Sequence, residues 1–196
     1  MKRWLAVIAS LCWLTGPALA GETIETQRYS LEAPPGVDWK ISRHAGGDVV
    51  ELMGRGRGAA GGEVSTVLVV VPHDVSGAYG ATHTERWLAD DIRRQEESNM
   101  ITLGVERGLY RLKDVDRFDV EMGGKAGYAM TYTQVIDGVQ ARGYLYLYFP
   151  DDFAETGVLY KFVCSKIGRK RDLSDPPWPD LEAAVSSFTV SVGVPE

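Results

Sequence analysis

The segment Lys125–Phe149, KAGYAMTYTQVIDGVQARGYLYLYF, decides the fold class of this chain. Two runs rich in aromatic and β-branched residues flank Asp137-Gly138, a dipeptide typical of the two-residue turn of a β-hairpin. Alternation with a period of two places Tyr144, Tyr146 and Tyr148 on one face of the second strand. The segment therefore predicts an antiparallel hairpin inside a larger sheet.

Similar runs on both sides of this hairpin predict further strands, and two stretches with helical spacing interrupt them. The first helix is expected at 84–97, with Trp87 as its anchor on the sheet, and a short second helix is expected to begin at Pro179. The predicted strands are 27–32, 39–42, 49–54, 64–71, 110–119, 125–136, 141–149, 158–166 and 189–192. This order predicts an α+β fold with a mainly antiparallel central sheet flanked by helices, an α-β-α sandwich.

Several short motifs resemble the PsbP/Mog1 superfamily. They are the opening Tyr29–Pro34 (YSLEAP) with Trp39 after it, Gly123–Tyr128 (GGKAGY), the tyrosine-rich strand 144–149 and the closing Ala183–Phe188 (AAVSSF). The resemblance implies the same sandwich over most of 27–192. Its bacterial members are exported proteins or lipoproteins, its plant members are non-catalytic subunits of the oxygen-evolving complex, and its fungal member binds a small GTPase. It supports the fold more than any function and supplies no catalytic residues.

The first twenty residues have the three parts of a secretory signal peptide. Lys2-Arg3 precedes the apolar run 4–14, and Ala18-Leu19-Ala20 supplies the small residues that a signal peptidase recognises. The apolar run ends after about eleven residues, whereas a membrane-spanning helix needs roughly 20. We therefore expect cleavage after Ala20, no membrane anchor afterwards, and one mature domain over 21–196.

The two cysteines support the same view of the mature protein. Cys12 follows Leu11 in the middle of the apolar run, whereas a lipobox cysteine follows a small residue at its end. We therefore expect a freely diffusing periplasmic or secreted protein and not a lipoprotein. Cys164 is then the only cysteine left, which excludes an intramolecular disulfide and favours a buried structural thiol.

The charge balance excludes two classes of partner. The chain has 21 Lys+Arg against 27 Asp+Glu, a formal net charge of −6. Nucleic acids and anionic lipids are bound through clustered basic residues, so neither is expected as the main partner. The one basic cluster, Lys166–Arg171, is interpreted as a solvated strand end. The glycine-rich stretch Gly54–Gly62 joins two strands and lacks a P-loop lysine, which favours a flexible hairpin connection over a phosphate cradle.

The sequence contains no catalytic signature. Asp151, Asp152 and Glu155 are interpreted as a solvated turn, and there is no G-x-S-x-G motif and no H-E-x-x-H motif. We therefore expect a protein that is not an enzyme and needs no cofactor. One metal hypothesis stays open: His73, Asp74 and His83 would suit zinc or copper if the intervening loop folds back.

Tyrosines form the other candidate site. Tyrosines on a half-exposed sheet can stack on a sugar, on a ring-bearing ligand or on a peptide, whereas tyrosines covered by a helix are ordinary core. Exposure of Tyr146 and Tyr160 separates these alternatives. The candidate residues are Tyr128, Tyr132, Tyr144, Tyr146, Tyr148 and Tyr160, which are expected to share one face of the sheet.

These observations lead to two hypotheses of function. The first is an exported, non-enzymatic binding or accessory module for a protein partner in the cell envelope. The alternative is a periplasmic protein that binds a small molecule or a metal through the tyrosine face or through His73, Asp74 and His83.

Overall fold

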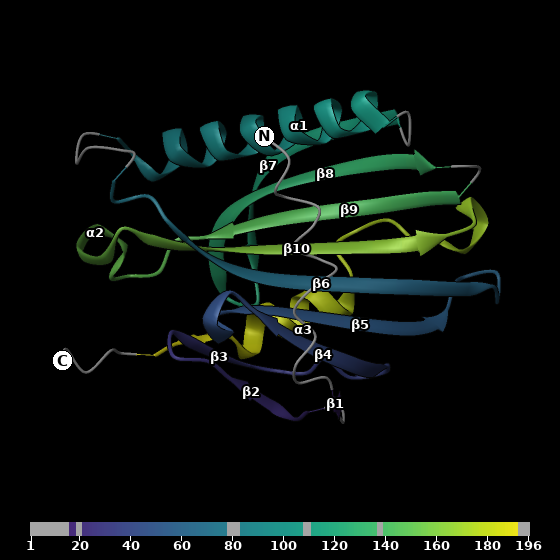
Figure 1. The fold of residues 1–196 in the computed structure, drawn as a ribbon, viewed down its shortest axis with the longest axis horizontal. Coiled ribbons are helices and arrows are strands. Elements are labelled where there is room, and N and C mark those ends of the chain that lie inside the picture. The colour runs from purple at the N-terminus through teal and green to yellow at the C-terminus, as the bar shows by residue number, and fades with distance from the viewer. Residues whose placement is uncertain (1–15, 19–20, 78–82, 108–110, 137–138, 192–196) are drawn as a thin grey trace.

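A computed structural model describes residues 16–18, 21–77, 83–107, 111–136 and 139–191. Its main sheet has eight strands in the order β1-β4-β5-β6-β10-β9-β8-β7, and every neighbouring pair is antiparallel. The strands of this sheet are β1 (Gly16–Ala18), β4 (Asp38–His44), β5 (Val49–Arg57), β6 (Glu63–Asp74), β7 (Arg111–Met122), β8 (Lys125–Ile136), β9 (Val139–Tyr148) and β10 (Val158–Gly168). Figure 1 shows these strands side by side.

The remaining elements lie around this sheet. A small second sheet has the order β11-β3-β2. The elements outside the main sheet are β2 (Thr23–Glu25), β3 (Tyr29–Glu32), η1 (Ala45–Gly47), α1 (Glu85–Arg107), α2 (Phe153–Thr156), η2 (Lys170–Asp172), α3 (Pro179–Ser187) and β11 (Thr189–Val190). The predicted α+β class with a mainly antiparallel sheet is confirmed.

Hairpin turns set the register of β7, β8 and β9. Ile136 pairs with Val139, which confirms the predicted hairpin, although its Asp137-Gly138 turn lies outside the described residues. Between β7 and β8, Met122 pairs with Lys125 around Gly123 and Gly124. Both of these glycines have positive φ, at 58° and 76°. A two-residue type I′ turn requires positive φ at both positions, and residues other than glycine adopt it with difficulty.

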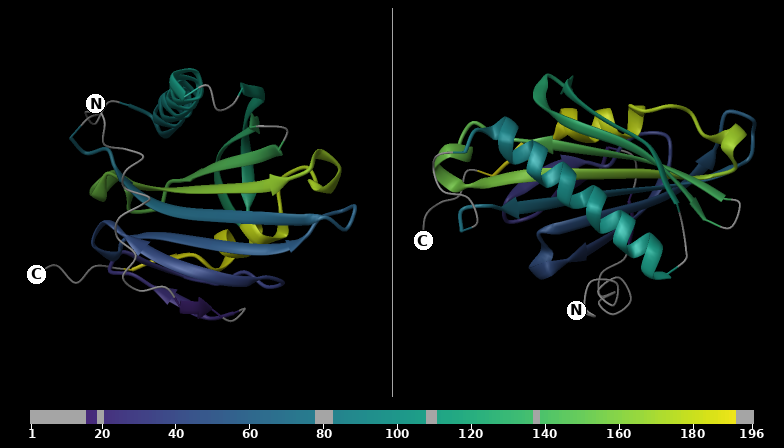
Figure 2. Two further views of the ribbon diagram at one scale, coloured as in Figure 1. Left: turned by 45° about the vertical axis from the view of Figure 1, so that its right-hand side comes forward. Right: turned by 90° about the horizontal axis from the view of Figure 1, so that it is seen from above.

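The two faces of the sheet carry separate apolar cores. Tyr144 and Tyr146 on β9 pack with α3 and with the small sheet, whereas Leu145 and Leu147 pack with α1 on the other face. Figure 2 shows α1 crossing one side of the molecule, with α3 behind it. Because successive side chains of a strand point to opposite faces, the apolar run of β9 serves both cores.

The anchoring of α1 differs from the prediction. Trp87 is 41 % exposed and points away from the sheet, so it is not the anchor. Leu88, Ala89 and Ile92 form the buried stripe instead, together with the buried Arg93. The helix also runs ten residues beyond the predicted end at 97, to Arg107.

Part of the α1 face of the sheet lies outside both cores. Val67, Val69 and Val71 on β6 are half-buried, and Met53 on the neighbouring β5 is 38 % exposed. None of these four side chains belongs to the two apolar clusters. The helices therefore lie on both faces of the sheet without covering all of it.

The glycine-rich loop between β5 and β6 is held in place. The Gly62 N–H donates to Oδ1 of buried Asp172 at 2.8 Å, and the Ala59 N–H donates to the Asp172 carbonyl at 3.1 Å. A Cβ at Gly58 or Gly62 would come within 2.3 Å of Asp172 atoms. The predicted hairpin connection is confirmed, but its expected flexibility is not, because hydrogen bonds to Asp172 hold the loop. The close contact with Asp172 also explains why glycine is needed there.

Only Gly16–Ala18 of the predicted leader is described, as the edge strand β1 against β4. Cleavage after Ala20 stays a prediction. Within the described ranges, no helix combines the length and apolar character that a membrane span requires.

Candidate functional site

The six predicted tyrosines do not share a face. Tyr128 pairs with Leu147, and Tyr132 pairs with Gly143, so both lie on the α1 face. Tyr144, Tyr146, Tyr148 and Tyr160 lie on the opposite face. The expectation of a single face is therefore wrong. Alternation fixes the faces within each strand, but the turn fixes the offset between strands, and here it pairs Tyr128 with a leucine.

Most of these tyrosines belong to the cores. Tyr144 and Tyr146 are fully buried, and Tyr160 is 3 % exposed. The Tyr146 hydroxyl donates to the Lys125 carbonyl at 2.8 Å. Burial raises the pKa of Tyr144 and of Tyr160 to about 12. An exposed tyrosine face for a ligand is therefore contradicted, because α3 and the small sheet cover it.

The three predicted metal ligands are not brought together. The Asp74 carboxylate accepts hydrogen bonds from the Ser76 N–H at 2.9 Å and from its hydroxyl at 2.6 Å. The His83 ring stacks on Trp87 with 4.1 Å between ring centroids. Burial, with Lys161 nearby, lowers the pKa of His73 on β6. Among the described residues, no group of three or more His, Cys, Asp or Glu side chains could hold a metal ion, so the structure does not bring His73, Asp74 and His83 together as a site.

Tyr128 instead lines a cleft at the end of the sheet where α1 begins. The cleft has a volume of about 700 Å³. The end of β7, the start of β8, the chain after β9 and the first turn of α1 form its walls. Its lining residues are Glu85, Asp119, Val120, Glu121, Ala126, Gly127, Tyr128, Phe149, Pro150, Asp151 and Ala154. We call it the acidic cleft.

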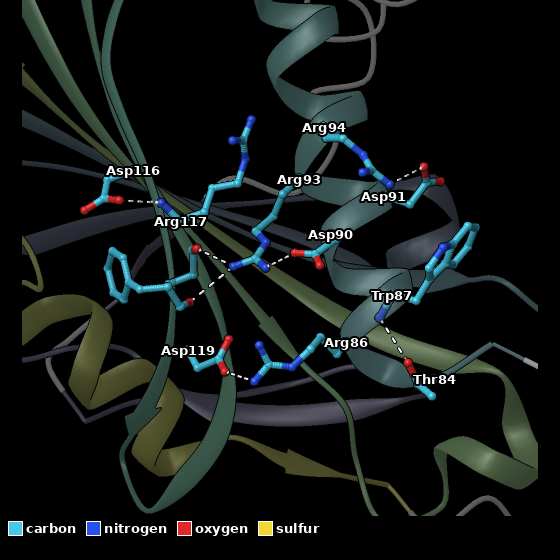
Figure 3. A network of polar contacts seen from close by, with 12 residues as sticks. Thr84, Arg86, Trp87, Asp90, Asp91, Arg93, Arg94, Asp116, Arg117 and Asp119 are labelled. Carbon is cyan, nitrogen blue, oxygen red and sulfur yellow. Dashed lines mark hydrogen bonds and ion pairs between the residues drawn. The ribbon is translucent and has the colours of Figure 1, made fainter.

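Four carboxylates give the acidic cleft its charge, namely those of Glu85, Asp119, Glu121 and Asp151. No lysine or arginine of the described chain is among the lining residues. Arg86 pairs with Asp119 at the rim, as Figure 3 shows. The other three carboxylates have no ion-pair partner within the described ranges, so the cleft keeps a negative potential.

Aromatic rings form one wall of the acidic cleft. Phe149 meets Tyr128 edge to face at 5.6 Å, and it meets Phe153 at 4.8 Å between centroids. The Arg93 guanidinium carbon lies 5.7 Å from the centroid of the Tyr128 ring. The π-face of an aromatic ring attracts cations, and Tyr128 already holds one in this way. Burial, followed by the nearby Glu85 carboxylate, raises the pKa of Tyr128.

Arg93 fixes α1 beside the acidic cleft. Its guanidinium donates to the carbonyls of Phe118 at 3.2 Å and of Ala129 at 2.9 Å, and it pairs with Asp90. Figure 3 shows the side chain reaching from the helix to β7 and β8. Phe118 and Ala129 are register partners, so one side chain clamps two neighbouring strands to the helix. Sequence reasoning missed Arg93 because a charged residue was not expected in the buried stripe.

No protein-family model and no curated protein matches the chain. Several solved structures are similar to it in fold. Cyanobacterial PsbP is among them. The solution structure of PsbP from Synechocystis sp. PCC 6803 is 14% identical, with a TM-score of 0.47, and the match covers 94% of this chain and 99% of that one. PsbP was the resemblance that the sequence predicted.

Two further solved structures are similar to the chain. A protein from Bacteroides thetaiotaomicron VPI-5482 is 14% identical with a TM-score of 0.45, and the match covers 88% of this chain but 49% of that one. This chain thus spans about half the length of the Bacteroides protein. A Pseudomonas aeruginosa protein of unknown function is 16% identical with a TM-score of 0.36, covering 84% of this chain and 99% of that one. These likenesses concern the fold alone.

Proposed function

We propose that this protein is an exported, non-enzymatic accessory module that binds a protein partner in the cell envelope, and that the acidic cleft receives a basic side chain of that partner. The observation that carries the proposal is the cleft itself, where four carboxylates stand beside the rings of Tyr128 and Phe149. The signal-peptide pattern of residues 1–20 supports export to the periplasm or beyond.

The chemistry of the acidic cleft favours a cation over other ligands. Asp119 is neutralised by Arg86, whereas Glu85, Glu121 and Asp151 are left to attract an incoming charge. A lysine or arginine side chain also has an apolar stem, which packs against aromatic rings while its charged end meets carboxylates. Surface ion pairs of this kind steer partners and fix orientation, and salt weakens them.

Titration with a basic peptide tests the proposal. The probe is a tetra-arginine amide, measured by calorimetry at low ionic strength. Two neutralising substitutions, Glu121→Gln and Asp151→Asn, should together weaken binding about tenfold, since two partly exposed ion pairs are worth roughly 1.4 kcal/mol. Raising the salt to 0.5 M should weaken binding by the intact protein in the same direction.

A matched control separates the acidic cleft from the overall charge. The variant Glu32→Gln with Glu182→Gln changes the net charge equally, but both side chains are exposed and lie outside the cleft. Its affinity for the peptide should stay within twofold of the unaltered protein. An equal loss in both double variants, or no binding at low salt, would remove the cleft as the binding site.

A further inference from the structure

A second cavity lies at the other end of the same three strands, and its charge is of the opposite sign. Its volume is about 590 Å³. Most of its walls come from the start of β7, the end of β8, the start of β9 and the loop after η2. Its lining residues are Lys113, Asp114, Thr131, Tyr132, Thr133, Val135, Gln140, Arg142, Gly143, Lys170, Asp175 and Pro176. We call it the basic pocket.

The sheet register places three cations in one row on the α3 face of the sheet, with Thr133 between the first two. Lys113 on β7 pairs with Thr133 on β8, Thr133 pairs with Arg142 on β9, and Arg142 pairs with Lys166 on β10. These four side chains therefore form one line across the sheet. Directly opposed like charges destabilise a sheet unless anions compensate them. In a chain with a net charge of −6, such a gathering of cations needs a local explanation.

The compensation is uneven along this line. Lys166 is well neutralised, since its ammonium lies 2.6 Å from the Asp180 carboxylate and 5.5 Å from the Trp178 ring centroid. Lys113 and Lys170 are exposed, and neither has an ion-pair partner in the described part of the chain. Arg142 pairs with Asp175. The lining of the basic pocket thus has three cations against two carboxylates: Lys113 and Lys170 have no ion-pair partner in the described part of the chain, Arg142 is paired with Asp175 from a loop, and Asp114 is the second carboxylate.

The pair between Arg142 and Asp175 joins a half-buried side chain to an exposed one. The side chain of Arg142 is 19 % exposed, whereas that of Asp175 is 89 % exposed. An ion pair with one end in water contributes little stability, so the exposed partner is easily replaced. The planar guanidinium of arginine matches a carboxylate in two parallel hydrogen bonds. Asp175 therefore fills the place that a ligand carboxylate would take.

We propose that the basic pocket binds a small dicarboxylate. One carboxylate of the ligand displaces Asp175 from Arg142, and the other meets Lys113 or Lys170. Lys113 and Arg142 stand two strand positions apart, with Thr133 between them, which is roughly 10 Å between backbones. Their long side chains reduce this gap to the span of a short dicarboxylate. This site is independent of the acidic cleft and of the function proposed for it.

Titration of the full chain with succinate, followed by chemical-shift changes and calorimetry, tests the proposal. Asp175→Asn removes the competing carboxylate and should tighten succinate binding severalfold. Arg142→Gln should weaken binding at least tenfold. Lys113→Gln with Lys170→Gln should weaken succinate more than acetate, because only succinate has a second carboxylate. Arg55→Gln is the matched control, since Arg55 also pairs with a carboxylate, that of Glu63, but lies outside the pocket.

Three outcomes would overturn the proposal. An unchanged or weaker affinity in Asp175→Asn would mean that Asp175 does not occupy a ligand position. Equal affinities for all variants, the Arg55→Gln control included, would indicate nonspecific binding of anions. Tighter binding of inorganic phosphate than of succinate would replace the dicarboxylate by a phosphate ligand. If Arg142→Gln fails to fold, Asp175→Asn still tests the proposal, because Asp175 is an exposed loop residue.

Discussion

Replacement of Arg93 by methionine should destabilise the protein by about 3 kcal/mol. Methionine keeps the volume of the stem but removes the guanidinium, which is buried and donates to the carbonyls of Phe118 and Ala129. Each buried acceptor that loses its donor costs roughly 1–3 kcal/mol. Asp90 adds little, because its side chain is 47 % exposed and water replaces the lost contact.

Urea unfolding, followed by fluorescence and by circular dichroism, measures this loss. With a slope of about 2 kcal/mol per molar urea, the midpoint should fall by roughly 1.5 M. Arg94→Met is the control, because Arg94 is the next residue of α1, is 60 % exposed and makes a 3.6 Å pair with Asp91. It should cost less than about 0.5 kcal/mol. A loss below 1 kcal/mol for Arg93→Met, or an equal loss for Arg94→Met, would refute the clamp of α1 on β7 and β8.

Two further predictions concern a pair of neighbouring valines and the buried thiol. Val70→Thr should lower the free energy of unfolding by about 1–3 kcal/mol, because Val70 is fully buried. Val69→Thr, on the half-open face, should lower it by less than about 0.5 kcal/mol. Similar losses for both variants in urea melts would contradict the assigned faces. Burial raises the pKa of Cys164 from 9.0 to about 12. The unfolded chain therefore loses the thiol proton at a lower pH than the folded protein does. The free energy of unfolding should fall as the pH rises above 9, by up to about 1.4 kcal/mol per pH unit. Six tyrosines with raised pKa values add a fall of their own above about pH 9, which both proteins share, so Cys164→Ala should show a smaller fall than the unaltered protein by the thiol's part alone. An identical fall in both proteins would show that the thiol does not contribute.

The sequence predicts the hairpins and the fold class because both depend on local patterns. Alternation within β9 puts Tyr144 and Tyr146 on one face, and the structure agrees. The offset between strands is a different quantity, since a shift of one residue moves every side chain to the other face. Alternation within each strand therefore does not decide whether Tyr128 and Tyr146 share a face, and in the structure they lie on opposite faces. The same applies to Lys113 and Arg142, which are 29 positions apart and share a face only through Thr133.

Residue polarity misled the sequence interpretation of α1. Trp87 was predicted as the anchor because it is a large apolar residue, yet in the structure Trp87 is exposed and Arg93 is buried. An arginine can enter a core when enough acceptors surround its guanidinium, and here two strand carbonyls and Asp90 supply them. Those acceptors come from two strands and the helix itself, so no short window of sequence displays them together.

The acidic cleft and the basic pocket should act independently of each other. Tyr128 and Thr133 line the two cavities from the same strand, β8, and they lie five residues or roughly 17 Å apart on opposite faces. Substitutions separated by more than about 10 Å without shared partners have additive effects. The double variant Asp151→Asn with Asp175→Asn should therefore bind the basic peptide as Asp151→Asn does and bind succinate as Asp175→Asn does. A departure from additivity beyond about 0.5 kcal/mol in either affinity would mean that β8 transmits a change between the two ends of the sheet.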